Sequence, residues 1–155
     1  AGRLRIVDLS SNGLGAAGAH ALLPALGPIE RLDLANNDLT SDVVRELLAA
    51  LPNIRVLTLR TNPLGDAAAE LIAEWPGATP PPTLDLGDTG TTARGALAPA
   101  PSGRLANLRL LRIDAQSDTA TRRALTRSRH LPLAKIYAPG PLDRSLSKSK
   151  RHRGA

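Results

Sequence analysis

The sequence Ile-Glu-Arg-Leu-Asp-Leu-Ala-Asn-Asn-Asp-Leu at residues 29–39 determines how the rest of the chain is interpreted. The stretch follows the frame Leu-x-x-Leu-x-Leu-x-x-Asn-x-Leu, in which Asn37 is the amide and Ile29, Leu32, Leu34 and Leu39 are the apolar residues. The same frame begins 25 residues earlier at Leu4 and 25 residues later at Ile54. A fixed period of about 20 to 50 residues is typical of stacked repeat proteins. The sequence therefore predicts a repeat architecture.

The frame continues toward the C-terminus in a weaker form. Further frames begin near residues 81 and 108, and a partial one near residue 133. Thr89 and Gln116 stand where the first three frames have Asn. We therefore expect about five repeats in residues 1–138, with the fourth as the least stable part of the array.

Each of the first three frames combines two kinds of apolar spacing. Alternation at Val7 and Leu9 predicts a short strand with these side chains directed inward. The Ala and Leu residues of 15–26 then recur at helical spacing, and Pro24 is expected to end or kink that helix. In the second frame, the predicted buried stripe of the helix is Val43, Leu47, Leu48 and Leu51.

The long period and two similar helical segments indicate a family. These segments are Leu-Gly-Ala-Ala-Gly-Ala at 14–19 and Leu-Gly-Asp-Ala-Ala-Ala at 64–69. With the repeated frame, they resemble the ribonuclease-inhibitor-like subclass of leucine-rich repeats. The resemblance implies an α/β solenoid shaped as a right-handed horseshoe arc, with parallel strands on the concave side and helices on the convex side.

The recurring Asn residues have a predicted structural role. Asn12, Asn37 and Asn62 each lie where the chain leaves the strand. A side-chain amide can donate and accept hydrogen bonds, so it can satisfy main-chain groups that leave the sheet. We expect a ladder of buried Asn side chains, with Thr89 and Gln116 as weaker substitutes.

The outward strand positions are the candidate binding residues, because folding does not require them to be apolar. Asp8 and Asp33 are expected side by side on strands about 4.8 Å apart, with Arg31 and Arg60 close enough to moderate their repulsion. An uncompensated like-charge pair lowers stability, which indicates either a partner-facing site or, equally, a merely solvated face on which Asp is common. The candidate residues are Asp8, Ser10, Arg31, Asp33, Thr58, Arg60, Asp85, Arg112 and Asp114.

Charge divides the chain into two parts. Residues 1–118 carry 10 Lys and Arg against 13 Asp and Glu, whereas residues 119–155 carry 10 against 1. Clustered Lys and Arg attract polyanions. We expect residues 139–155 to form a basic disordered tail that either contacts a polyanion or only aids solubility.

Composition excludes several classes of function. The chain has no Cys, which removes disulfides, thiolate metal sites and Cys nucleophiles, and fits an intracellular location in the cytoplasm or nucleus. No apolar run reaches the roughly 18 residues of a membrane span, and no metal or cofactor site is indicated. The chain lacks Met and begins within a repeat, so we expect a processed chain or a piece of a longer array.

The sequence therefore predicts a non-enzymatic module that binds a protein through its concave strand face. One alternative is binding of nucleic acid or another acidic surface through the basic C-terminal end. A second alternative, a GTPase-activating role, is implied only by the resemblance, because one family with this subclass of repeat acts in that way. No residue is assigned to catalysis.

Overall fold

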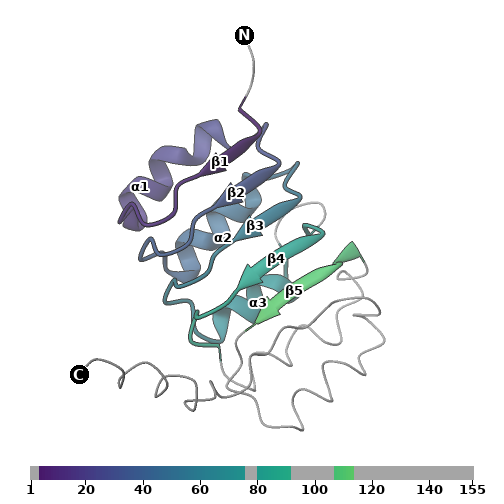
Figure 1. Ribbon diagram of the computed structural model, residues 1–155. Coiled ribbons are helices and arrows are strands. Elements are labelled where there is room, and N and C mark those ends of the chain that lie inside the picture. The colour runs from purple at the N-terminus through teal and green to yellow at the C-terminus, as the bar shows by residue number, and fades with distance from the viewer. Residues whose placement is uncertain (1–3, 76–79, 92–106, 114–155) are drawn as a thin grey trace, which may run out of the picture.

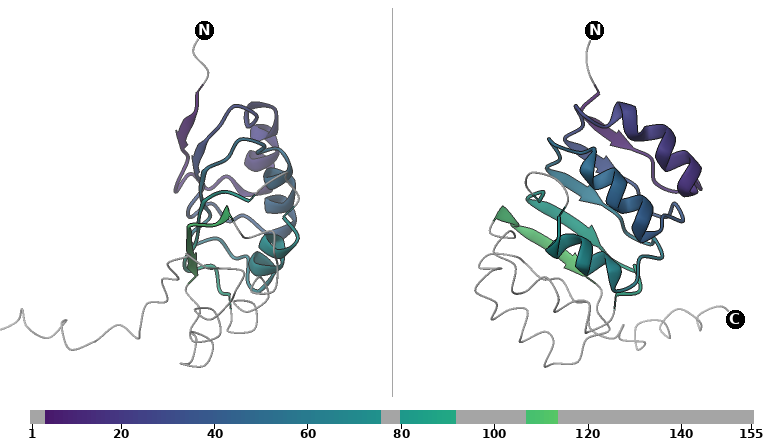
Figure 2. Two further views of the ribbon diagram at one scale, coloured as in Figure 1. Left: turned by 90° about the vertical axis from the view of Figure 1, so that its right-hand side faces the viewer. Right: turned by 180° about the vertical axis from the view of Figure 1, so that it is seen from behind.

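The protein is built on one parallel sheet with helices along one of its faces (Figures 1 and 2). The computed structural model describes residues 4–75, 80–91 and 107–113. The strands lie in chain order: β1 (Ile6–Asp8), β2 (Arg31–Asp33), β3 (Val56–Thr58), β4 (Thr83–Leu86) and β5 (Leu110–Ile113). The helices are α1 (Gly15–Leu22), the 3₁₀ turn η1 (Leu23–Ala25), α2 (Ser41–Ala49) and α3 (Ala67–Ala73). None of the helices described is long and apolar enough to cross a membrane.

The strand register follows the repeat frame. Ile6 pairs with Arg31, Arg31 with Val56, Val56 with Thr83, and Thr83 with Leu110. The spacing along the chain is therefore 25, 25, 27 and 27 residues. The two larger steps match the predicted frame starts at 81 and 108, so each of the first five frames contributes one strand.

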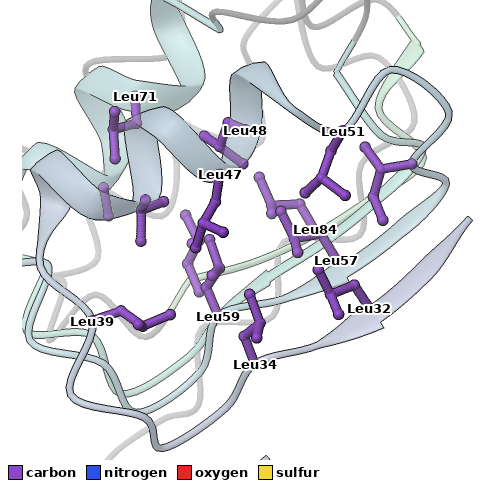
Figure 3. Close-up of a cluster of buried hydrophobic side chains, with 14 of the residues drawn as sticks. Leu32, Leu34, Leu39, Leu47, Leu48, Leu51, Leu57, Leu59, Leu71 and Leu84 are labelled. Carbon is purple, nitrogen blue, oxygen red and sulfur yellow. The ribbon is translucent and has the colours of Figure 1, made fainter. Parts of the chain in front are cut away.

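Leucine side chains from the strands and helices fill the space between the two layers (Figure 3). The strand leucines Leu32, Leu57 and Leu84 are at most 2% exposed and stack from one repeat to the next. The predicted stripe of the second helix is confirmed, and Val44, which was not predicted, is buried with it. In the first repeat, the predicted stop at Pro24 appears as the change from α1 to the 3₁₀ turn.

The amide ladder is present at Asn37 and Asn62, both fully buried. Asn62 Oδ1 accepts the N–H groups of Asn37 and Leu39 from the preceding repeat, at 3.1 and 3.0 Å. Its Nδ2 donates to the Leu34 carbonyl of that repeat at 2.9 Å, and to two carbonyls of its own repeat. Each buried amide therefore connects two neighbouring repeats.

The prediction that Asn12 is buried is wrong. Asn12 is exposed, because β1 is the end strand of the described sheet and only the second repeat packs against it among the described residues. The Leu that opens its frame, Leu4, is 73% exposed for the same reason. Burial of a frame position therefore depends on having a repeat on both sides.

The ladder changes its chemistry at the third turn. Gly13 and Asp38 have positive φ angles of 59° and 54°, but the equivalent residue in the third repeat is Pro63, whose ring excludes such a conformation. There the Leu64 N–H donates to the Asn62 carbonyl at 2.8 Å.

Thr89 is buried as a substitute for Asn, but its hydroxyl forms hydrogen bonds within its own repeat, with the Leu86 carbonyl and the Thr91 hydroxyl. The link to the preceding repeat comes instead from the Thr91 hydroxyl, which donates to the Gly65 carbonyl at 3.1 Å.

Several sequence predictions lie outside the described residues. They are the substitute amide at Gln116, the candidate Asp114, the partial frame near residue 133, the domain limit at residue 138 and the tail over 139–155.

The ladder predicts a large difference between two Asn substitutions. Asn62→Ala should lower the free energy of unfolding by about 3 kcal/mol, because it leaves buried main-chain groups of two repeats without partners. Asn12→Ala should lower it by less than about 1 kcal/mol, because water replaces the lost bonds. Urea denaturation followed by circular dichroism measures both. Equal losses would contradict the proposed role of the buried amide.

Candidate functional site

The face of the sheet that points away from the helices, here called the open sheet face, carries the candidate binding residues (Figure 2). Alternate side chains of a strand point to opposite faces, so the strand register arranges the outward side chains in three columns. The first column is Ile6, Arg31, Val56, Thr83 and Leu110. The second is Asp8, Asp33, Thr58, Asp85 and Arg112. The third follows two residues later, with Ser10, Ala35, Arg60 and Gly87.

The first column is mainly aliphatic, and Arg31 is its only member among the predicted binding residues. Ile6 and Leu110 are 67% and 38% exposed, and Val56 is half-buried between them along the column. These apolar side chains lie on the face opposite the core, where folding does not explain them. The sequence itself contains this pattern of apolar residues, because each first-column residue lies two positions before the second-column residue of its frame.

The acidic residues of the second column close the ends of their strands. Asp8, Asp33 and Asp85 each use Oδ1 to accept the N–H of the residue two positions later, at 2.9, 2.9 and 2.8 Å. This local bond satisfies a main-chain donor that leaves the sheet. Asp8 and Asp33 are register partners, as predicted, but part of their recurrence has a structural cause.

Asp8 accepts a second hydrogen bond from the same residue. The Ser10 hydroxyl donates to the Asp8 carboxylate at 2.7 Å, in addition to the Ser10 N–H. The hydroxyl bond, followed by the N–H bond, lowers the pKa of the Asp8 carboxyl below its ordinary value. The carboxylate therefore stays ionised to a lower pH than an ordinary Asp does, and Ser10 orients it.

Basic residues balance the C-terminal half of the open sheet face. Arg112 Nη1 lies 3.6 Å from Asp85 Oδ2, across neighbouring strands. Arg60 pairs with Asp88. The effect of Arg60 on the Asp8–Asp33 pair stays a prediction, because the Arg60–Asp88 pair joins it to the next repeat and does not test that effect. Arg31 is exposed in the first column, beside the strand position of Asp33.

The open sheet face combines apolar and charged side chains. The described residues contain no group of three or more metal-binding side chains that could hold an ion. What the face offers is an aliphatic column beside carboxylates held by hydrogen bonds and by ion pairs.

The comparisons with known proteins agree with this geometry. The sequence profile of the family described as "Leucine Rich repeat" matches residues 4–23. Among solved structures, the chain is similar to the tropomodulin C-terminal domain of Caenorhabditis elegans, with a TM-score of 0.61 and 17% sequence identity over 81% of each chain. None of the curated proteins matches the chain. The profile, the structural likeness and the parallel sheet together support an α/β leucine-rich-repeat fold.

The Ser10 bonds lead to a testable pKa change. Ser10→Ala removes the hydroxyl bond, so the pKa of the Asp8 carboxyl should rise toward its ordinary value. A carboxyl with a lowered pKa in the folded state stabilises the fold above its unfolded pKa and loses this contribution as the pH falls. NMR titration of the Asp8 side chain in the two proteins measures the shift. An unchanged Asp8 midpoint would show that the hydroxyl does not hold the carboxylate.

Proposed function

We propose that this protein is a non-enzymatic interaction module that binds a partner protein through the open sheet face. Leucine-rich-repeat domains generally mediate protein–protein interaction, which supports the class of function. The predicted ribonuclease-inhibitor-like arc would make the open sheet face concave. The observation that carries the proposal is the aliphatic first column, exposed beside a charged column on the face opposite the core.

The energetics of the columns favour a binding role. Burial of apolar surface contributes about 25 cal/mol per Å², so Ile6, Val56 and Leu110 are the side chains from which a partner would gain most. The carboxylates beside them are already positioned by the Ser10 and Ala35 N–H groups. A surface that is ordered before binding loses little conformational entropy on association. The mechanism is display of fixed side chains on a rigid sheet.

Two substitutions in the first column test the proposal directly. Val56→Lys together with Leu110→Lys removes apolar area and places two cations on the open sheet face. The matched control, Ala21→Lys with Ala49→Lys, adds the same charge on exposed positions of α1 and α2. We expect the first pair to weaken partner binding by about 30-fold or more and the control to have little effect.

Affinity capture from nuclease-treated lysate provides the comparison. The baits are the intact chain, the two double variants and a chain that ends at Gly140, each checked for an unchanged melting temperature. Partners lost only with the first-column variant would support the open sheet face. Partners lost only with the shortened chain would transfer the function to the basic C-terminal residues. Loss with the helix-face variant would contradict the proposal.

A further inference from the structure

Arginine residues border the open sheet face where the strands begin. The residues directly before the first column are here called the strand-start row, and they are Arg5, Glu30, Arg55, Pro82 and Arg109. The Arg55 N–H donates to the Glu30 carbonyl, and the Arg109 N–H to the Pro82 carbonyl, each at 2.8 Å. Arg5 pairs with Glu30. Arg55 and Arg109 are exposed and form no ion pair within residues 4–75, 80–91 and 107–113, so both guanidinium groups are available to a partner.

The second column carries the opposite charge on the first strands of the sheet. Asp33 lies on β2, between β1 and β3, and its register partners are Asp8 and Thr58. No base in the described part of the chain pairs with Asp33, whereas Asp85 pairs with Arg112. A carboxylate has about four acceptor sites, so Asp33 can accept further bonds from a donor of another molecule.

The aliphatic first column lies between the two kinds of charge. Val56 and Thr83 are half-buried and Leu110 is exposed, on the neighbouring strands β3, β4 and β5. The second column lies three residues after the strand-start row, which is about 10 Å at about 3.3 Å per residue. The open sheet face is therefore a band with cations along one margin, apolar side chains in the middle and carboxylates along the other margin.

The dimensions of this band fit an α-helix that lies across the strands. The diameter of a helix with its side chains is about 10–12 Å, close to the width of the band. One helical turn rises about 5.4 Å, and neighbouring strands are about 4.8 Å apart, so each turn of the helix meets the next strand. An extended segment would find no main-chain partners, because β2, β3 and β4 are bonded on both sides. A helix satisfies its own main chain.

We propose that the segment of the partner that contacts this protein is an amphipathic helix with an apolar stripe and oppositely charged flanks. Its acidic flank meets Arg55 and Arg109, its basic flank meets Asp33, and its stripe covers the first column. The inference rests on the proposed function, because it names the partner chemistry of the open sheet face. Apolar contact provides affinity, whereas the charges select the helix, because like charges brought together at either margin disfavour a wrong partner.

Two helical peptides of identical composition test the inference with the intact chain. Both carry the same leucine stripe and have their helicity checked by circular dichroism. The segregated peptide has Glu on one flank and Lys on the other, and the mixed peptide has both residue types on each flank. We expect the segregated peptide to bind about tenfold or more tightly at low ionic strength, with a difference that shrinks as salt is added. NMR signals of the Val56 and Leu110 methyl groups should shift on binding.

Variants of the chain locate the two charged margins. Arg55→Glu should weaken binding of the segregated peptide by about fivefold or more. The matched control Arg45→Glu makes the same charge change on an exposed position of α2 and should leave the affinity unchanged. Asp33→Asn should also weaken binding, while its amide oxygen keeps an acceptor for the Ala35 N–H. Equal affinity of the two peptides, equal losses in Arg55→Glu and Arg45→Glu, or unchanged methyl signals would each overturn the inference.

Failure of this inference is distinguishable from failure of the proposed function. Loss of a captured protein in Val56→Lys with Leu110→Lys, together with equal binding of the two peptides, would leave the open sheet face as the binding surface and reject the charged helix as its partner. A captured protein that is unaffected by the two first-column substitutions would contradict the proposed function itself.

Discussion

The structure depends on main-chain N–H groups that one repeat donates to the side-chain amide of the next. A parallel sheet with short strands leaves many main-chain groups without partners where the chain turns toward the helices. Asn37 and Asn62 satisfy these groups on both sides with one buried residue each. The same bonds set the register of the strands, because each amide recognises two N–H groups at a fixed spacing. Leucine burial contributes the larger free energy, and the apolar pattern of the strands sets the register together with these bonds.

The inward side chains of the strands must be apolar to form the core, whereas the outward side chains on the open sheet face are available for function. The columns of the open sheet face do not contribute to the leucine core, so their side chains can vary without loss of the fold. The structure also shows a limit to this freedom. Asp8, Asp33 and Asp85 close their strand ends with local hydrogen bonds, so their charge is displayed by residues that also have a structural role. The aliphatic first column has no such role, which makes it the more specific indication of a partner.

How much the sequence predicts depends on whether a feature is local or lies between repeats. The strands, the buried Leu positions and the kink at Pro24 follow from spacing within one frame, and they are confirmed. The exposure of Asn12 could not be predicted from its frame, because it depends on the repeat that would pack over it. The Arg60–Asp88 and Arg112–Asp85 pairs depend on how long side chains cross between strands, which no spacing specifies. The aliphatic first column follows from spacing as well, because its residues recur two positions before the acidic ones in each frame.

The most direct test of the account is hydroxyl-radical footprinting of the chain with and without a captured protein partner. This method reports the solvent exposure of individual side chains, so it separates the sheet face from the helix face. The account predicts that binding protects Val56 and Leu110, while Leu22 and Leu23, half-buried at the end of α1 and in η1, keep their reactivity. Protection confined to the helix side, with Val56 and Leu110 unchanged, would contradict the claim that the open sheet face is the binding surface.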